Sequence, residues 1–261
     1  MKKLILFAIV LCLTFAGTST VFAGSKIKMI RIGTEGAYPP FNYVDKNGKV
    51  QGFDIDIAKA LCKVAHVKYK FVVQDWDGLI PGLIAKKFDC IIASMSITAE
   101  REKKVSFTNK YYSTPARFVE RKGAGIKITK AGLTGKIIGV QRGTVAANFV
   151  NDEFGKVATI KSYTTQDEAN LDLVSGRVDV VVADSVVLNG GFLSKPMGKD
   201  FRFVGPGFNN PKWFGKGIGI AVRKDDTQLI NLFNKAIAKI RANGTYKKIN
   251  AKYFNFDVYG S

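Results

Sequence analysis

A carboxylate, an aromatic ring and two prolines stand close together near the start of the chain. Glu35, Tyr38 and the pair Pro39-Pro40 follow an apolar run at 29–32, which predicts a strand. Prolines restrict the backbone, so the turn after this strand fixes where both side chains point. Loops at strand ends hold small ligands in α/β proteins. A carboxylate beside an aromatic face suits a ligand that carries a cation.

The first residues predict a secretory signal rather than part of the fold. Lys2 and Lys3 precede an apolar run at 4–16, and Val21-Phe22-Ala23 offers small residues where a signal peptidase needs them. We expect residues 1–23 to be a signal peptide that is cleaved after about Ala23. A membrane anchor is the alternative, but the apolar run is short for a span.

The chain of 261 residues carries a formal net charge of +19. Such a charge often indicates binding to nucleic acid or to an anionic surface. Here the cations are scattered singly and no basic run of five occurs, which favours a solvated basic face and no nucleic-acid partner. Attraction to an anionic membrane or wall is the functional alternative.

The cysteine and histidine residues predict neither a metal site nor a cofactor. Cys62 and Cys90 remain after cleavage, and they form either a disulfide, which export permits, or two buried thiols. The single histidine, His66, has no Cys or His near it in sequence and sits where a helix ends. A surface or packing role therefore fits it best.

Strand and helix patterns alternate along the chain, which predicts an α/β fold with mostly parallel sheets. Two such units separated by extended runs near 113–116 and 209–216 predict two lobes with a cleft between them. The segment 205–212 reads as irregular. Strands are expected at 29–32, 69–73, 90–93, 137–140, 178–183 and 217–222, and helices at 54–64, 78–85, 145–154 and 166–174, with a short helix capped by Thr98 and a long one capped by Asp225 or Asp226.

Several motifs, taken in their order and spacing, resemble one known family across nearly the whole chain after residue 23. The family is that of the periplasmic solute-binding proteins that feed polar amino acids to ABC importers. Within it, the chain is most similar to the arginine and lysine/arginine/ornithine binders. The motifs are Gly33-Thr34-Glu35-Gly36-Ala37-Tyr38-Pro39-Pro40-Phe41, Gly52-Phe53-Asp54-Ile55-Asp56, Asp75-Trp76-Asp77-Gly78-Leu79-Ile80-Pro81, Ser96-Ile97-Thr98-Ala99-Glu100-Arg101, Gly244-Thr245-Tyr246 and Lys252-Tyr253-Phe254.

The resemblance implies two lobes that close on a ligand, each a mostly parallel sheet flanked by helices. The first lobe would be discontinuous, with residues 24–113 and 213–261, and the second would hold 117–208. The crossings at 113–116 and 209–216 would act as hinges.

The resemblance also implies partners for the groups that all amino acids share. Arg101 would grip the carboxylate with its planar fork, and Asp184 would hold the ammonium. The alternatives are a surface ion pair for Arg101 with a neighbouring Glu and a helix cap for Asp184. The further expected ligand-binding residues are Ser94, Met95, Ser96, Gln141, Thr144 and Val145.

Glu35, Tyr38 and Trp76 would form the pocket for the ligand's side chain. Trp76 stands between Asp75 and Asp77, and its ring could stack on a flat guanidinium while Glu35 pairs with the far end of that group. Core packing for Trp76 and a solvated loop charge for Glu35 are the alternatives.

The sequence departs from the lysine/arginine/ornithine binders in three respects. Ala93 stands where they have Ser, and Val145-Ala146 where they have Thr and Gln. Arg142 is an extra cation that would repel a cationic ligand unless its head points to water. These departures bear on selectivity for arginine more than on the amino-acid class.

The resulting hypothesis is a monomeric periplasmic protein that binds arginine first, lysine or ornithine more weakly, and delivers the ligand to an ABC-type permease in the inner membrane. An enzyme on the same scaffold, similar to the cyclohexadienyl dehydratases, is the first alternative, although no His is expected in the cleft. A basic surface-adhesion protein is the second.

Overall fold

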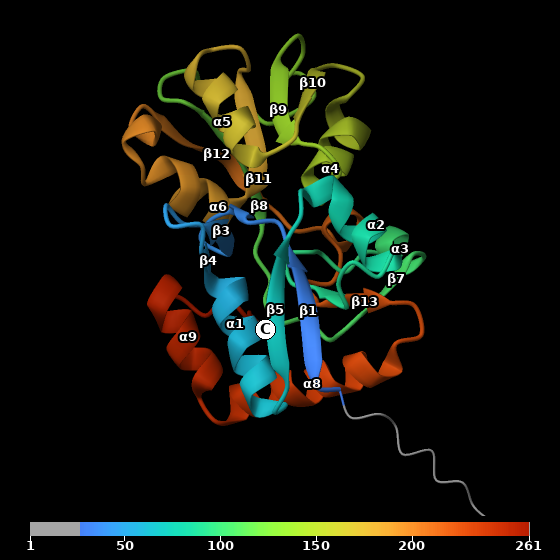
Figure 1. Ribbon diagram of the computed structural model, residues 1–261. Helices are drawn as coiled ribbons and strands as arrows, with labels where there is room; N and C mark the ends of the chain where they lie inside the picture. Colours follow the sequence, from blue (N-terminus) through green and yellow to red (C-terminus); the bar gives the residue numbers. More distant parts are fainter. Residues whose placement is uncertain (1–26, 261) are drawn as a thin grey trace, which may run out of the picture.

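The computed structural model describes residues 27–260, which form two sheet-centred halves connected by two chain crossings (Figure 1). The predicted signal peptide, residues 1–23, lies outside the described residues. Nothing in 27–260 has both the length and the apolar character that a membrane-crossing helix requires.

The first half is built on a five-stranded sheet that combines the start of the chain with a later segment. Its strands stand in the order β5 (Lys68–Val73), β1 (Met29–Thr34), β6 (Cys90–Ile91), β13 (Ala221–Arg223) and β7 (Val105–Phe107). β13 runs antiparallel to both neighbours and the other four strands share one direction, so the sheet is mostly parallel. Its helices are α1 (Phe53–Val64), α2 (Leu79–Ile84), α3 (Ala99–Glu102), α8 (Thr227–Ala242) and α9 (Thr245–Tyr253).

The second half has the same arrangement around a second five-stranded sheet. Its strands stand in the order β10 (Thr159–Tyr163), β9 (Ile137–Gln141), β11 (Val180–Asp184), β8 (Ala116–Arg121) and β12 (Phe201–Phe208). Here β8 is the antiparallel member. Its helices are α4 (Val145–Phe154), α5 (Gln166–Val174) and α6 (Ser185–Val187), which runs on into a π-helical turn at Leu188–Leu193.

A small antiparallel sheet, which the sequence patterns did not predict, shapes the loop after β1. It consists of β2 (Ala37–Tyr38), β3 (Asn42–Val44) and β4 (Val50–Gln51). Strands of two or three residues are too short to show an alternating pattern, which explains why they were missed. The sheet holds Tyr38 opposite Asn42 and so fixes the turn through the two prolines.

The expectation of an irregular segment at 205–212 is wrong. Residues 205–208 belong to β12, which pairs with β8 across a register shift between Val204 and Phe208, and residues 211–212 begin the helix at Pro211–Phe214. Gly205 and Pro206 read as a turn, yet an edge strand tolerates both residues at a bulge. β12 is an edge strand, with β8 as its one neighbour in the sheet. On its other side there is no strand among residues 27–260 to accept a hydrogen bond, so the missing N–H of Pro206 costs none there.

The two crossings run from β7 to β8 and from β12 to β13, and both are more ordered than extended runs. Ala116 already pairs within the second sheet, and the second crossing contains the short helix α7 (Pro211–Phe214), capped by Asn210. Asn210 accepts a hydrogen bond from the amide of Lys212 at 3.0 Å. The predicted hinges at 113–116 and 209–216 stay predictions.

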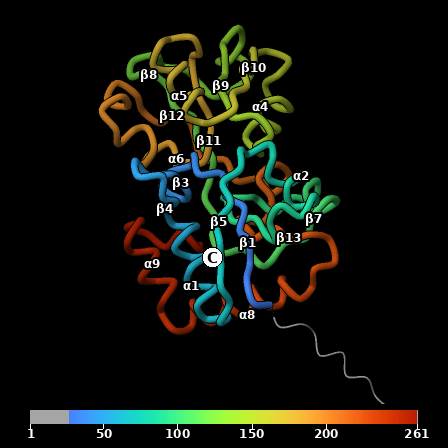
Figure 2. Tube along the Cα trace, in the orientation of Figure 1, coloured from blue at the N-terminus to red at the C-terminus, as the bar shows by residue number. Residues whose placement is uncertain are grey.

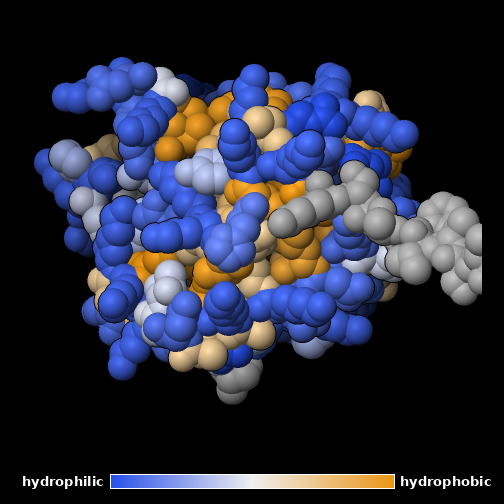
Figure 3. All heavy atoms as spheres, turned by 60° about the horizontal axis from the view of Figure 1, so that its bottom comes forward, coloured by the Kyte–Doolittle hydropathy of each residue, from blue (hydrophilic) through white to orange (hydrophobic). Residues whose placement is uncertain are grey.

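Periodicity predicted the long helices correctly. In α8 the residues Leu229, Phe233, Ile237 and Ile240 are buried, and Asp226 caps the helix by accepting from the amide of Leu229 at 3.1 Å. α8 and α9 pack against α1 and against each other, as the chain trace in Figure 2 also shows. At this end of the molecule hydrophilic residues surround smaller apolar patches (Figure 3).

Cys62 and Cys90 are two free, fully buried thiols. Of the two readings left open by the sequence, the structure therefore shows small buried side chains rather than a disulfide. Burial raises the pKa of the Cys62 thiol to about 12, so the thiolate that a reactive cysteine needs does not form near neutral pH.

Candidate amino-acid site

A cavity of about 760 Å³, measured to its open mouth, lies between the two halves. The predicted site residues that line it are Glu35, Tyr38, Trp76, Ser94, Ser96, Arg101, Gln141, Thr144, Val145 and Asp184. Met95 is not among the lining residues, because its side chain packs in a core cluster with Leu79 and Val105.

Arg101 is held at the cavity by the short helix α3. The hydroxyl of Thr98 caps this helix and accepts from the amide of Arg101 at 3.3 Å. The guanidinium donates to the carbonyls of Ser96 at 3.1 Å and Gly143 at 3.3 Å. Burial lowers its pKa to about 10, so it remains charged, and within residues 27–260 it forms no salt bridge. Such a cation can still bind an anion.

Asp184 caps a helix and also lines the cavity. It ends β11 and caps α6, because one carboxylate oxygen accepts from the amides of Val186 at 2.8 Å and Val187 at 3.3 Å. The other oxygen accepts from the hydroxyl of Thr114, and the residue also lines the cavity. Burial raises its pKa to about 6, since no cation in the described chain pairs with it.

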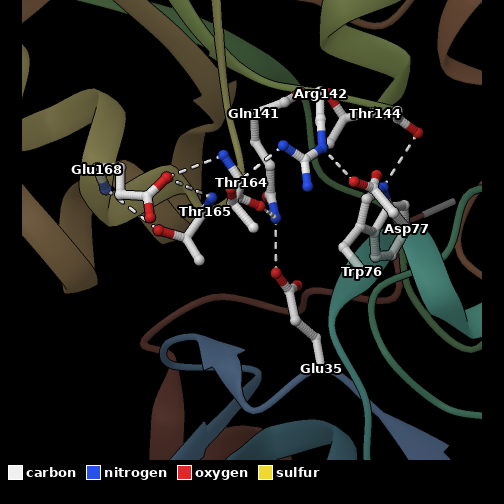
Figure 4. Close-up of polar contacts among 10 residues, drawn as sticks. Glu35, Trp76, Asp77, Gln141, Arg142, Thr144, Thr164, Thr165 and Glu168 are labelled. Atoms are coloured by element: carbon white, nitrogen blue, oxygen red, sulfur yellow. Dashed lines mark hydrogen bonds and ion pairs between the residues drawn. The ribbon is translucent and has the colours of Figure 1, made fainter.

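Glu35 reaches across the cavity and is only 6% exposed. Its carboxylate accepts from the side-chain amide of Gln141 at 2.6 Å, so the two halves meet here (Figure 4). Burial, with a smaller contribution from the nearby carboxylates Asp75, Asp77 and Asp167, raises the pKa of Glu35 to about 7. This end of the cavity is therefore short of positive charge.

Trp76 forms a second contact between the halves. Its indole N–H donates to the carbonyl of Gly143 at 3.0 Å (Figure 4), and the guanidinium carbon of Arg101 lies 5.2 Å from its ring centre. Trp76 therefore lines the cavity, and its partly buried side chain also packs against the core cluster that contains Leu79. The ring leaves a planar surface beside the charged groups.

Arg142 does not confront a ligand as a bare cation. It is exposed and pairs with Asp77 of the opposite half, and it also donates to the hydroxyl of Thr164 at 3.2 Å. Figure 4 shows this pair beside Trp76. Arg142 is not among the residues that line the cavity, and the carboxylate of Asp77 offsets the repulsion considered from the sequence.

The start of α4 presents backbone N–H groups at the cavity. Thr144 caps this helix by accepting from the amide of Ala147 at 3.1 Å, and its hydroxyl donates to the carbonyl of Gln141 at 2.8 Å. Thr144 and Val145 both line the cavity. A helix N-terminus carries partial positive charge and suits a carboxylate, in support of Arg101.

Asp54 is buried outside the cavity lining and connects segments that carry site residues. The sequence analysis assigned no separate role to this residue. This fully buried carboxylate accepts from Tyr111 at 2.7 Å, Asn42 at 2.9 Å and Ser94 at 3.1 Å. Asn42 in turn accepts from the amide of Gly36 at 2.9 Å, next to Glu35. An Asp inside a motif at a helix start was the available signal, but its partners are distant in sequence.

Other lining residues were also missed. They come from the two crossings and from the segment that leads into β13, namely Ser113, Thr114, Ala116, Asn209, Phe214, Gly215, Gly217 and Ile218. Nothing in their residue types marks them as binding groups. Their position at the crossings, where the two halves meet, is the feature that brings them to the cavity.

Comparison with known proteins agrees with this geometry. The family described as bacterial extracellular solute-binding proteins, family 3, matches residues 30–256. The L-arginine-binding protein of Pseudomonas aeruginosa is 52% identical over 235 residues, covering 90% of this chain and 91% of its own. The histidine-binding periplasmic protein of Salmonella typhimurium is 44% identical over 261 residues, covering all of both chains. A solved structure described as an ancestral arginine-binding protein bound to arginine superposes with a TM-score of 0.81 at 37% identity, covering 88% of this chain and 100% of that one.

The buried network around Asp54 predicts a large effect of Asp54→Asn on stability. The amide would place a donor against Tyr111, Asn42 or Ser94, all of which donate to the carboxylate. The expected loss is about 1–3 kcal/mol of unfolding free energy, or several degrees in thermal unfolding. Asp56→Asn on the same helix is the control, because its partly exposed pairs are worth less. Equal melting temperatures for the two variants would contradict the role given to Asp54.

Proposed function

The chain belongs to the bacterial extracellular solute-binding proteins, family 3, and from that we propose that it captures a basic L-amino acid, arginine first, between its two halves. The observation that supports arginine as the ligand is the cluster of carboxylates at one end of the cavity. Glu35 is buried there with Asp75, Asp77 and Asp167 nearby, and the described residues bring no salt-bridge partner to Glu35. A guanidinium supplies the missing charge and can lie against Trp76.

The groups shared by all amino acids have partners of opposite charge in this proposal. Arg101 and the start of α4 take the α-carboxylate, and Asp184 with the hydroxyls of Ser94 and Thr114 takes the α-ammonium. Each of these charged side chains lines the cavity without a salt bridge within residues 27–260. A bound zwitterion would offset the free-energy cost of burying the charges of Arg101 and Asp184.

The two halves act as lobes in this proposal, with residues 24–113 and 213–261 opposite 117–208. Contacts such as Glu35–Gln141 and Trp76–Gly143 join them in a closed form. Opening at the crossings would break these contacts and admit the ligand. The closed protein, a monomer, would then deliver the amino acid in the periplasm to an ABC-type permease.

An enzyme on the same scaffold is the second candidate. The observation in its favour is Glu35, since a buried carboxyl with a pKa of about 7 suits general acid catalysis. His66 does not line the cavity, so Glu35 would have to act alone. Binding of a cation accounts for the same carboxylate without a reaction, and the named relatives bind amino acids.

Replacing Arg101 by Ala should weaken every amino acid alike, because the α-carboxylate is common to them. The expected loss is about 2–5 kcal/mol of binding free energy. Calorimetry with arginine, lysine, ornithine, histidine and glutamine measures it, and arginine should bind tightest to the unmodified protein.

Arg121→Ala, which removes an exposed arginine outside the cavity, is the matched control. Near-normal affinity of the Arg101→Ala protein would show that the carboxylate binds elsewhere. Tighter binding of glutamine than of arginine would exclude the cationic pocket. The unmodified protein should form no product from prephenate, and steady turnover would favour the enzyme.

Citrulline, which has the shape of arginine without its charge, should bind more weakly as pH rises from 5 to 8. Closure over a neutral side chain keeps the pKa of Glu35 near 7, above its ordinary value, so this complex takes up a proton and is favoured at low pH. With arginine the guanidinium offsets the carboxylate charge.

The ratio of arginine to citrulline affinity should therefore grow about tenfold or more between pH 5 and 8. Taking the ratio cancels effects on Asp184, which meets the same ammonium in both ligands. The Glu35→Gln substitution should remove the pH dependence of this ratio and reduce the difference between arginine and citrulline affinity. A ratio that stays constant with pH in the unmodified protein would mean that Glu35 does not distinguish the charged side chain of arginine from the neutral one of citrulline.

Closure of the lobes predicts a smaller radius of gyration with arginine. Small-angle scattering on the free and the saturated protein measures it, and the Arg101→Ala variant at the same arginine concentration should stay at the free value. An unchanged radius with saturation confirmed by calorimetry would exclude closure as the binding step.

A further inference from the structure

Positive charge gathers on the two C-terminal helices. Between Asp226 and Asp257 the sequence has no Asp or Glu. The same segment contains six exposed cations, which we call the basic helix face: Lys235, Lys239, Arg241, Lys247, Lys248 and Lys252.

The fold neutralises little of this charge. Among the described residues, Lys252 is the only member of the basic helix face with a salt bridge, to Asp56 of α1 at 2.6 Å. Arg241 lies over the ring of Tyr259 at 3.4 Å and keeps its charge. Four lysines therefore present ammonium groups to the surroundings without an ion pair inside residues 27–260.

Most positions of these lysines do not stabilise their helices. Lys235 and Lys239 are four residues apart on α8, as are Lys248 and Lys252 on α9, and like charges at this spacing repel. Lys247 and Lys248 also stand near the N-terminus of α9, whose first turn has no acidic residue and no side-chain cap, and cations there oppose the helix dipole. The last turns favour cations at Lys239 and Arg241 of α8 and at Lys252 of α9. Folding stability therefore does not account for Lys235, Lys247 and Lys248, whereas an external anion would.

The basic helix face is separate from the amino-acid site. No residue of α8 or α9 lines the cavity. Figures 1 and 2 place both helices at the end of the molecule away from the second sheet. A partner on this surface would leave the cleft open to its ligand.

Apolar side chains are exposed at the same end of the first sheet. Met29 is 54% exposed and Tyr69 is 40% exposed, at the start of β1 and β5. In Figure 3 apolar patches appear between the hydrophilic residues of this end. Cations around apolar side chains match the headgroup region of a bilayer, which offers phosphates and acyl chains together.

We propose that the basic helix face holds the protein on an anionic phospholipid surface. Two packed helices with separately spaced cations suit an extended sheet of headgroups. Nucleic acid is less suited, because five of the six cations are lysines, whereas arginine is the preferred cation for nucleic-acid recognition. The predicted export would bring the protein to a lipid surface, where bound protein searches for a membrane partner in two dimensions.

Sedimentation with lipid vesicles tests the proposal on the full mature chain. The first variant replaces Lys235, Lys239, Lys247 and Lys248 by Gln. The control replaces four exposed lysines of the other half, which also lack a salt bridge there, by Gln: Lys127, Lys130, Lys156 and Lys195. Both variants lose the same net charge, so they separate the surface from the overall charge.

The unmodified protein should bind phosphatidylglycerol-containing vesicles and not pure phosphatidylcholine vesicles, with binding that weakens as salt rises. The first variant should bind about tenfold or more weakly, and the control should stay within about threefold of the unmodified protein. Melting temperature and arginine affinity should be unchanged in both, which shows that they are folded.

Equal losses in the two variants would overturn the proposal, because overall charge would then explain the binding. Indifference of the unmodified protein to phosphatidylglycerol would overturn it as well. A DNA duplex that binds more tightly than the vesicles, with the same loss in the first variant, would assign the basic helix face to a polyanion instead.

Discussion

The carboxylate of Asp54, buried at the start of α1, accepts hydrogen bonds from three side chains that come from different parts of the chain. Asn42 connects it to the loop of Glu35, Ser94 to the loop before Arg101, and Tyr111 to the segment that leads into the first crossing. A buried carboxylate costs free energy unless its oxygens accept hydrogen bonds. The three segments are therefore held in fixed positions relative to one another. The cavity wall of the first half is thereby fixed before any ligand arrives. Ser94, held in a left-handed conformation at φ 54, shows how closely that wall is determined.

The second half brings the complementary groups, and the closed cleft then contains charges that the protein itself does not neutralise. Burial raises the pKa of Glu35 and Asp184 and lowers that of Arg101. Desolvation is the largest cause of all three shifts, and no ion-pair partner within residues 27–260 counters it. Closing an empty cleft is therefore costly, and a ligand with one anionic and two cationic groups removes the cost. In the proposed function, selectivity and the coupling of closure to binding would follow from the same unpaired charges.

Sequence patterns predicted the elements that depend on residues close together in the chain. The helices α1, α4 and α8 follow apolar periodicity, and Thr144 caps α4 and Asp226 caps α8. The strand β12 could not be predicted, because Gly205-Pro206-Gly207 indicates a turn and only the edge position in the sheet permits a strand there. The expected site residues other than Met95 line one cavity, since their motifs end strands and begin helices. The role of Asp54 was missed because its partners lie 12, 40 and 57 residues away.

A chain with a net charge of +19 that binds a cation needs a separation of charges, and the structure provides one. Interactions between exposed charges are largely screened beyond about 8 Å at physiological ionic strength. A ligand at the cleft therefore meets the field of Glu35, Asp75, Asp77 and Asp167, which are close, rather than that of distant lysines. Arg142 is paired with Asp77. The lysines of α8 and α9 are thus free to act on another partner without weakening capture of a cation, because distance and salt uncouple the two surfaces.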